Sequence, residues 1–342
     1  MKSIRKYLSL SICVCCFTSI TAQDINFSQF YELPLLRNPA LAGLFQGDIR
    51  ITAAYRNQWE SVTTPYQTQA LGSELKFSLG QNTYDFVTLG LQITNDQAGD
   101  SKFSKTQILP VLNFHKSVNG EKDSYISGGV MAGAVQQSFD PTKLQFDDQF
   151  VNGAYSATNP TNQTFNNTKL TYYDLTVGLS YSSVIGSDTR YYVGIGAFHV
   201  TRPKVAFMKT NDVRLNRKFV ANFGLSIPTG DQDKFVVYGD YFTQGGNSQA
   251  QGGFLYSHDL SQYGDDEIVS FAVGSFYRWN DAVIPVVKFD YYQWGLGISY
   301  DANVSKLKAA SQLRGGLEVT LSYRSYLNIL NSSVNKVRCP IF

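Results

Sequence analysis

The chain has 342 residues and a formal net charge of +2, from 29 basic and 27 acidic side chains. This near balance gives no reason to expect binding to nucleic acid or another polyanion. Aromatic residues are abundant at 14%, whereas charged residues make up only 16%. In a secreted chain such a composition fits a transmembrane β-barrel, and it leaves a soluble β-propeller or β-sandwich open as the alternative.

The first 22 residues have the layout of a secretory signal peptide. The cationic start comprises Lys2, Arg5 and Lys6. An apolar run follows as far as Ile20, and the small residues Thr21 and Ala22 end it. We predict cleavage after Ala22, so that residues 1–22 take no part in the mature fold.

Three of the four cysteines, Cys13, Cys15 and Cys16, lie within this predicted signal. They raise the alternative of a lipoprotein anchor. The residue before Cys13 is Ile12, however, where lipidation usually requires a small side chain. Only Cys339 stays in the mature chain, and because one thiol cannot form an internal disulfide, we expect no disulfide framework.

The mature chain begins with an apolar stretch, residues 23–47, that is interrupted by Pro34 and Pro39. Proline disfavours both the interior of a helix and a central strand. The stretch is too apolar to lie free in water. We therefore predict that residues 23–47 form an N-terminal plug or periplasmic segment that packs within or beneath a barrel.

Apolar and polar residues alternate along most of the chain from residue 48 onward. Ile49 and Ile51, for example, alternate with Arg50 and Thr52. Side chains of a strand point alternately to its two faces, so each such segment has one apolar face and one polar face. Many segments are long enough for tilted membrane strands, and no later apolar run approaches the roughly 20 residues of a membrane-spanning helix.

We predict an all-β fold, a single antiparallel transmembrane β-barrel of about 14 strands within residues 48–324, followed by a periplasmic C-terminal tail at 325–342. The predicted strands are 48–60, 66–79, 84–95, 103–117, 123–138, 170–185, 189–201, 217–228, 233–243, 248–259, 266–278, 282–291, 294–302 and 313–324. The longest connections, 139–169, 202–216 and 303–312, all follow odd-numbered strands. With a periplasmic N-terminus they lie outside the cell, where bacterial barrels place long loops.

Charged residues near the centres of predicted strands mark the polar face. They are Arg50, Glu74, Lys76 and Glu318. In a barrel this face lines the lumen, while the apolar face meets lipid. Arg56 falls on the same polar face and needs a carboxylate or carbonyl partner, because a buried unpaired charge is costly. Tyr55 and Trp59 fall near the outer interface, where amphipathic rings favour the headgroup level.

The sequence contains no clear constellation of catalytic or metal-binding residues. His115, His199 and His258 are scattered without partners at metal-ligand spacing, and we interpret them as lumen or interface residues. The 139–169 connection contains three aspartates that raise the alternative of a calcium site, namely Asp140, Asp147 and Asp148. The regular acidic spacing of a calcium loop is missing, which favours a solvated loop.

Motifs of enzymes are also missing. No serine lies in a nucleophile elbow, and the chain has no zinc-binding helix and no phosphate-binding loop. We therefore predict a protein that is not an enzyme and that carries no catalytic residue, metal or cofactor.

Several short motifs occur in an order that resembles a known family. The first are Gln23-Asp24-x-x-Phe27-Ser28-Gln29-Phe30, Asn38-Pro39-Ala40-Leu41-Ala42-Gly43 and Tyr55-Arg56-Asn57-Gln58-Trp59. The later ones are Asn95-Asp96-x-Ala98-Gly99, His199-Val200-Thr201-x-Pro203, Gly297-Ile298-Ser299-Tyr300-Asp301, Gly316-x-Glu318-x-x-Leu321-x-Tyr323 and Cys339-Pro340-Ile341-Phe342. Together they span the mature chain, which resembles PorP/SprF-type membrane proteins of the type IX secretion system.

The resemblance implies a non-enzymatic protein in the outer membrane of a member of the Bacteroidota, associated with type IX secretion and gliding motility. The implied partners are outer-membrane lipid, a secreted surface adhesin or its C-terminal domain, and periplasmic ring or peptidoglycan-binding components of the machinery. The candidate plug and family-motif residues are Asn38, Pro39, Ala40, Gly43, Tyr55, Arg56, Asn57, Gln58 and Trp59. The candidate residues of the tail are Cys339, Pro340 and Phe342, which would bind a partner or, through the aromatic C-terminus, aid barrel assembly.

Two other functions fit the same pattern. Fourteen strands behind an N-terminal segment with Asn-Pro-Ala also resemble FadL-type fatty-acid channels, in which an N-terminal hatch fills the barrel; residues 30–44 would then be the plug. A structural porin is the third interpretation. An apolar pocket in the lumen would favour a channel for hydrophobic small molecules, whereas a sealed or protein-filled lumen would favour docking of an adhesin or of the secretion machinery.

Overall fold

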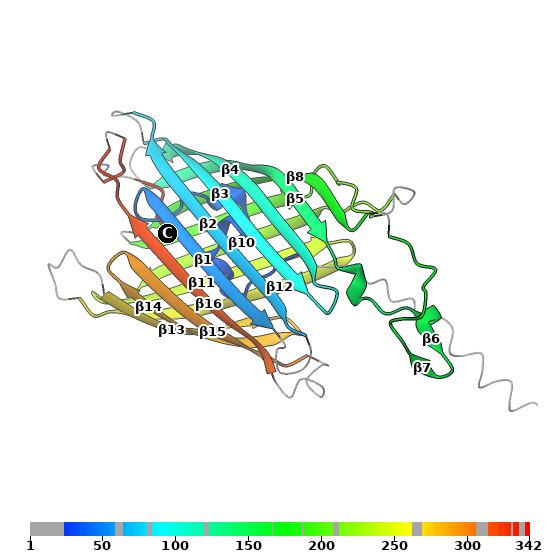
Figure 1. Cartoon of the computed structure of the whole chain (residues 1–342). Coiled ribbons are helices and arrows are strands. Elements are labelled where there is room, and N and C mark those ends of the chain that lie inside the picture. The colour runs from blue at the N-terminus through cyan, green and yellow to red at the C-terminus, as the bar shows by residue number, and fades with distance from the viewer. Residues whose placement is uncertain are drawn as a thin grey trace, which may run out of the picture.

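The structure is a computed structural model, and it describes residues 24–58, 64–80, 84–119, 123–165, 167–186, 188–207, 212–261, 269–305, 314–329, 331–334 and 339–342. Long antiparallel strands close into one barrel (Figure 1). They are β1 (Ile49–Gln58), β2 (Tyr66–Ser78), β3 (Phe86–Ala98), β4 (Phe103–Asn119), β5 (Ser124–Ser138), β8 (Lys169–Ile185), β9 (Thr189–Phe198), β10 (Lys218–Pro228), β11 (Asp233–Gln244), β12 (Asn247–Asp259), β13 (Val269–Arg278), β14 (Ala282–Tyr291), β15 (Trp294–Asn303) and β16 (Arg314–Ser325).

Each of these strands pairs with its neighbours in sequence, and β1 pairs with β16 to close the ring. The closing register runs from Ile49 opposite Ser325 to Gln58 opposite Gly316. The prediction of an all-β antiparallel barrel is confirmed, and every predicted strand has an observed counterpart. The strand predicted at 189–201 ends earlier, at Phe198, because the next residue, His199, has a φ of 55°.

The longest connection carries short elements that the sequence analysis did not predict. A two-stranded sheet of β6 (Phe150–Val151) and β7 (Ala154–Tyr155) lies between β5 and β8, after the 3-10 turns η3 (Pro141–Lys143) and η4 (Asp147–Gln149). This sheet projects away from the barrel in Figure 1. We call the end of the barrel that carries this connection the loop end, and the opposite end, where β1 begins, the turn end.

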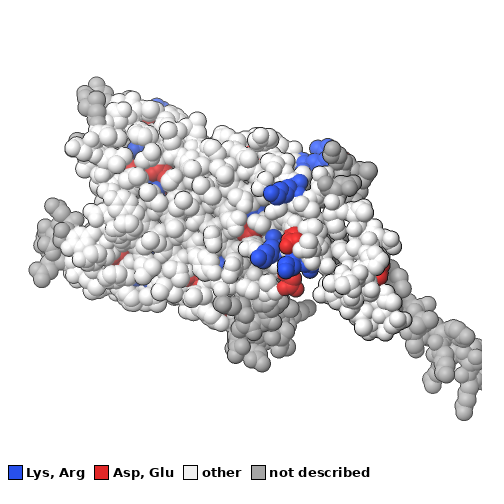
Figure 2. Space-filling view, viewed as in Figure 1, with Lys and Arg blue, Asp and Glu red and all other residues white. Residues whose placement is uncertain are grey.

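The barrel wall reverses the burial pattern of a soluble sheet. On β4, Ile108 and Leu112 point outward with 49% and 54% of their surface exposed, whereas Asn113 and His115 point inward and are buried. The outward faces of the other strands are likewise rich in exposed aliphatic and aromatic side chains. The visible wall in Figure 2 is largely free of charged side chains, as expected of a surface that contacts lipid.

The lumen contains the chain's own N-terminal segment, residues 24–47, drawn in dark blue inside the barrel in Figure 1. It forms three short turns: η1 (Phe30–Glu32), α1 (Pro34–Arg37) and η2 (Pro39–Leu41). Pro34 and Pro39 each open a turn, where the missing N–H costs no hydrogen bond. No helix in the described part of the chain is long and apolar enough to cross a membrane.

Apolar side chains of this segment form the core together with inward-facing side chains of the wall. Leu35 packs in a cluster with Val111 and Met131, and Phe30 packs in another with Phe276. The ring centroids of Phe30 and Phe276 lie 5.4 Å apart in an edge-on arrangement. The barrel is therefore a shell around a packed interior, and the N-terminal segment supplies the centre of it.

Candidate functional site

The N-terminal segment begins near the loop end of the lumen. The Asp24 carboxylate lies 2.8 Å from Lys105 Nζ, 3.5 Å from Lys218 Nζ and 3.5 Å from His199 Nε2. These partners lie near the start of β4, at the start of β10 and directly after β9, all at the loop end. Because β1 starts at the turn end, the segment runs through the barrel from one end to the other.

The surroundings of Asp24 and His199 favour the charged forms of both side chains. Burial lowers the pKa of His199, but the hydrogen bond with Asp174, at 2.6 Å, and the nearby Asp24 carboxylate outweigh this effect and raise the pKa to about 9. Burial raises the pKa of Asp24, but the positive charges of Lys105 and Lys218 hold it well below its ordinary value. The N-terminal segment is thus tethered at the loop end by charge.

Glu318 of β16 holds the next part of the segment. Its carboxylate accepts the backbone N–H groups of Ser28 and Gln29, at 2.7 and 2.6 Å. The Gln29 side chain donates to the backbone carbonyl of Glu318 and accepts from Thr320, at 3.2 and 2.8 Å. A side chain at Gly297 would overlap the Gln29 amide, so glycine leaves the space that this contact needs.

Arg56 has both kinds of partner expected of a buried guanidinium. It lies 2.8 Å from the Asp301 carboxylate and also donates to the backbone carbonyl of Asn26. Arg278 shares Asp301, at 3.1 Å, and donates to Ser28 Oγ, at 2.8 Å. Two buried arginines and one carboxylate therefore surround the start of the segment. Each of the three groups makes a direct hydrogen bond with Asn26 or Ser28.

A second buried ion pair lies midway along the segment. The Arg37 guanidinium makes a two-pronged contact with Asp240 of β11, at 2.6 and 2.9 Å, and donates to Tyr192 Oη at 2.7 Å. It also lies over the Phe30 ring, 4.9 Å from its centroid. A planar guanidinium suits such a site because it satisfies the carboxylate and the ring at once.

The Asn38-Pro39-Ala40 motif is held by neutral groups. Asn38 Oδ1 accepts the Ala40 N–H at 2.9 Å and so caps η2, while its Nδ2 donates to the backbone carbonyls of Ile195, at 3.1 Å, and Leu179, at 3.3 Å. Its side chain thereby fixes the local turn and bonds it to β8 and β9.

Side chains of β4 and β8 also bind this motif. Asn113 Nδ2 donates to the carbonyls of Ala40 and Ala42, at 3.0 and 2.7 Å. Ser180 Oγ also donates to Ala40 O, at 3.0 Å, and His115 Nε2 donates to Ala42 O, at 2.7 Å. Neutral amide, hydroxyl and imidazole groups thus satisfy backbone carbonyls that would otherwise be buried without partners.

Glycines in the wall provide the space for the same motif. A Cβ at Gly129 would overlap the backbone of Pro39, and a Cβ at Gly178 would overlap the Asn38 amide. Gly43 has a φ of 84°, which favours glycine, and its N–H donates to Glu74 at 2.8 Å. The motif therefore fits a slot in the wall, and the fit depends on glycine both in the wall, at Gly129 and Gly178, and in the motif, at Gly43.

The C-terminal tail closes the turn end. Lys76 Nζ donates to the carbonyls of Phe45, at 2.6 Å, and Pro340, at 3.3 Å. One side chain thus joins the end of the N-terminal segment to the C-terminal tail. Cys339 is buried, and burial raises the pKa of its thiol. The Phe342 ring packs edge-on against Tyr192 at 4.6 Å.

Asp48, at the point where the chain leaves the lumen, anchors the first part of the tail. It accepts the backbone N–H groups of Leu327 and Ser333, at 2.9 and 2.7 Å, and a hydroxyl bond from Ser332. The residue that precedes β1 and the tail that follows β16 are thereby fixed to each other at the turn end.

The residues singled out in the sequence fall into three places. Asn38, Pro39, Ala40 and Gly43 lie in the lumen slot, and Cys339, Pro340 and Phe342 lie at the turn end. In β1, Tyr55 points outward with 40% of its surface exposed and Arg56 points inward, while Asn57 and Gln58 end the strand. Trp59 and the predicted signal peptide, residues 1–22, lie outside the described residues.

Most of the wall residues that bind the segment were not predicted from the sequence, among them Asn113, Gly129, Ser180, Asp240 and Arg278. Their period-two position indicated that they face inward, but nothing in the sequence indicated which of them meet. Residues of four separate family-like motifs, Arg56, His199, Asp301 and Glu318, prove to converge on residues 24–29.

The cavities that border the N-terminal segment differ widely in size. Two cavities beside the N-terminal segment have volumes of about 30 and 70 Å³. A larger polar cavity of about 590 Å³ opens at the loop end, lined by Asp24, Asn26, Arg56 and Gln58 among others. Within the described residues, no group of three or more His, Cys, Asp or Glu side chains is arranged to hold a metal ion.

Solved structures with a similar fold include the CymD monoaromatic hydrocarbon channel, at 12% identity, covering 87% of this chain and 94% of that one with a TM-score of 0.42. The Ralstonia pickettii toluene transporter TbuX matches at 10% identity over 84% and 92% of the two chains, with a TM-score of 0.47. CdiB from Escherichia coli matches at 9% identity over 80% and 63%, with a TM-score of 0.44. Comparison with curated proteins finds no match.

One family model covers most of the chain. The model described as type IX secretion system membrane protein PorP/SprF matches residues 19–323, from the end of the predicted signal peptide to β16. The chain therefore belongs to the PorP/SprF family of type IX secretion system membrane proteins, as a closed β-barrel of the bacterial outer membrane.

Proposed function

We propose that this protein is a non-enzymatic docking barrel, which holds a secreted adhesin at the cell surface or binds components of the type IX secretion machinery. The observation that carries the proposal is the occupied lumen. Residues 24–47 run through it, and residues 339–342 pack at its turn end. A barrel filled by its own termini offers surfaces for partners in place of a path for solutes.

The volumes inside the barrel support docking over a FadL-like channel. Sites for small organic molecules usually measure roughly 300–1,000 Å³. Two cavities beside the N-terminal segment, at about 30 and 70 Å³, lie far below this range. The 590 Å³ cavity at the loop end is polar, which does not suit a hydrophobic substrate.

Two exposed surfaces are suited to partners on opposite sides of the membrane. At the loop end, which we place outside the cell, β6 carries Phe150 and Val151 with 60% and 49% of their surface exposed. At the turn end the tail exposes Tyr326, Ile329 and Val334. We propose that the first surface contacts the adhesin and the second contacts periplasmic machinery.

In this proposal Cys339, Pro340 and Phe342 act by fixing the tail to the barrel. Burial of Cys339 and the packing of Phe342 hold the end of the tail in place. The apolar residues closer to β16 are then presented to the periplasm without detaching from the barrel.

Affinity purification from native membranes tests both surfaces. One variant replaces residues 147–162 with a short Gly-Ser linker, and a second changes Tyr326, Ile329 and Val334 to serine. We expect the first variant to lose a copurifying surface adhesin and the second to lose periplasmic components, each keeping the other partner. If wild-type protein copurifies with neither class of partner, the docking proposal fails.

A further inference from the structure

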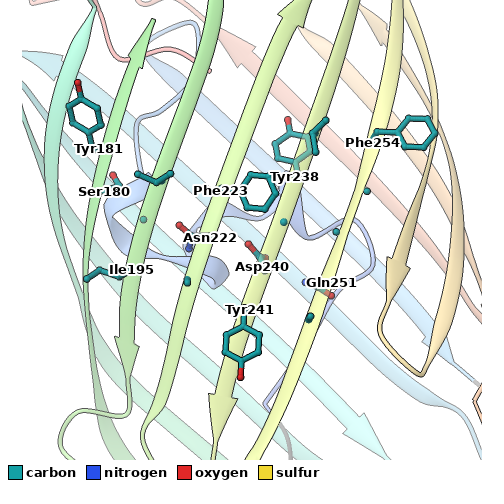
Figure 3. A pocket seen from close by; sticks show the side chains of 18 of the residues that line it. Ser180, Tyr181, Ile195, Asn222, Phe223, Tyr238, Asp240, Tyr241, Gln251 and Phe254 are labelled. Atoms are coloured by element: carbon teal, nitrogen blue, oxygen red, sulfur yellow. The ribbon is translucent and has the colours of Figure 1, made fainter. Parts of the chain in front are cut away.

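The lipid-facing wall carries a hollow that the docking role does not explain. It lies over strands β8 to β13, on the outside of the barrel, and has a volume of about 1110 Å³ (Figure 3). We propose that this hollow, together with a basic hairpin at its loop end, binds a phosphorylated glycolipid of the outer leaflet, with acyl chains in the hollow and phosphate on the hairpin.

Small outward-facing residues form the floor of the hollow. Ala221 of β10 and Ala250 of β12 both lie opposite Tyr241 in the pairing register. Gly252 lies opposite Gly239, and a side chain at Gly239 would overlap the Phe223 ring, which therefore lies flat across the wall. Such small residues allow another apolar group to approach the backbone closely.

Large apolar residues form the rims. Phe223, Tyr241 and Phe254, labelled in Figure 3, are exposed on the outer face around this floor. Elsewhere at the outer face the corresponding positions hold branched residues, for example Val287 of β14 and Ile298 of β15, both exposed. The outer surface of the barrel is therefore recessed here, and aromatic rings line the sides of the hollow. Such a shape suits linear acyl chains.

The hairpin between β9 and β10 carries the charge. Arg202, Lys204, Arg214 and Arg217 are all exposed there. Among the described residues of the hairpin, 199–207 and 212–217, Asp212 is the one carboxylate; it lies 3.3 Å from Arg214 and 3.9 Å from Lys204. Lys204 and Arg214 form a direct β-bridge, and Asp212 lies against both of them. Four basic side chains thus share one carboxylate, so the described part of the hairpin carries a net positive charge.

One strand connects the two features. The outward positions of β10 and the residue before it are, in order from the loop end, Arg217, Phe219, Ala221 and Phe223. At about 3.4 Å per residue, Arg217 lies roughly 14 Å from Ala221 along the strand. A cation at headgroup level, an aromatic ring below it and a recessed apolar floor match an amphiphile with an anionic head.

The chemistry of the hairpin favours phosphate. Guanidinium groups bind phosphate oxygens through paired, charge-assisted hydrogen bonds. Arg217 Nε donates to the carbonyl of Val200, at 3.2 Å, which holds its exposed guanidinium at the rim. A soluble phosphate would bind to the hairpin alone, and a neutral lipid would bind in the hollow alone. A phosphorylated lipid binds to both.

Binding of lipid A to the purified full-length protein in detergent tests the proposal, with dephosphorylated lipid A and a soluble glucosamine phosphate as comparison probes. The charge variant is Arg214→Gln with Arg217→Gln, and the matched control is Lys116→Gln with Lys143→Gln, two lysines that are not part of the hairpin. Ala221→Trp fills the hollow without changing charge. Heat-modifiable migration in gels confirms that each variant retains a folded barrel.

We expect the charge variant to weaken lipid A binding about tenfold, as the loss of two charge-assisted contacts implies, while the control leaves it unchanged. Ala221→Trp should weaken binding of lipid A but not of glucosamine phosphate. Equal losses in the charge variant and the control would overturn the proposal, because binding would then follow overall charge. A charge variant that keeps lipid A but loses a copurifying protein would also overturn it and assign the hairpin to an acidic protein.

Discussion

The two halves of the N-terminal segment are held in the barrel by different chemistry. Residues 24–29 are held by acidic and basic side chains, with Asp24 bound by Lys105 and Lys218 and the backbone of residues 28–29 bound by Glu318. Residues 38–43 are held mainly by neutral donors and by glycine-shaped space, as at Asn113 and Gly129.

This difference has consequences for stability. A buried ion pair is costly to break because the remaining charge loses its partner, whereas a neutral hydrogen bond leaves a smaller penalty. Ionised groups also respond to pH, while amide and hydroxyl groups do not. The charged half should therefore be sensitive to charge removal and pH, and the neutral half to changes in shape.

The largest effect is expected at Asp301 in the charged half. Asp301→Ala removes the carboxylate that Arg56 and Arg278 share. The buried Arg56 guanidinium loses its carboxylate partner, whereas Arg278 keeps Asp281, at 3.0 Å. We expect the free energy of unfolding, measured by urea titration in detergent, to fall by about 3–5 kcal/mol. Asp212→Ala, an exposed carboxylate, is the control and should change it by about 1 kcal/mol or less. Equal effects would contradict the role assigned to Asp301.

The second-largest effect is expected from a larger side chain in the wall beside the neutral half. Gly129→Ala puts a methyl group into the backbone of Pro39, so we expect a loss of about 1–3 kcal/mol and faster proteolysis of the N-terminal segment. Gly128→Ala, one residue earlier on β5, is the matched control. A Cβ there meets only Leu179, at 3.7 Å on the outer face, and should be tolerated. Similar behaviour of the two variants would argue against the slot.

Removal of a single neutral donor should have a smaller effect. Asn113→Ala removes two hydrogen bonds, but Ala40 O keeps its bond from Ser180 and Ala42 O keeps its bond from His115. We expect a loss of about 1 kcal/mol in the same urea titration. A loss as large as that of Asp301→Ala would show that the neutral half is not the more tolerant of the two.

The smallest expected effect is a change of local stability at residues 24–29 with pH. The pKa of His199 is about 9 in the folded barrel, above its ordinary value of 6.5, so its stabilising contribution is complete below pH 6.5 and is lost as pH rises through 9. Hydrogen exchange of residues 24–29 should therefore speed up relative to residues 38–43 between pH 7 and pH 10, after correction for intrinsic rates. His199→Gln should remove this pH step, and its persistence would assign the step to another group.

The same comparison shows what the sequence can predict. Period-two alternation predicted all the barrel strands, because the face of each side chain follows from local order alone. It also placed Arg56 in the lumen. Its partner Asp301 lies 245 residues away, and pairing across a barrel depends on shear and register that a single sequence does not contain.

The neutral half was more accessible to sequence reasoning than the charged half. Asn38-Pro39 is a local turn signal, and its capping bond to Ala40 lies within three residues. The glycines that receive it, Gly129 and Gly178, resemble any other strand glycine until the motif is placed against them. The C-terminal residues Cys339 to Phe342 likewise gave no local indication that they fold back against Lys76 and Tyr192.

The central claim is that the chain's own termini close the lumen, and conductance of the reconstituted full-length protein in a planar bilayer tests it most directly. The account predicts no steady conductance steps for the wild-type barrel, and steps for Gly129→Leu, in which the N-terminal segment is displaced from its slot. Steady open-channel steps in the wild type, at the level of a barrel with an empty lumen, would contradict it.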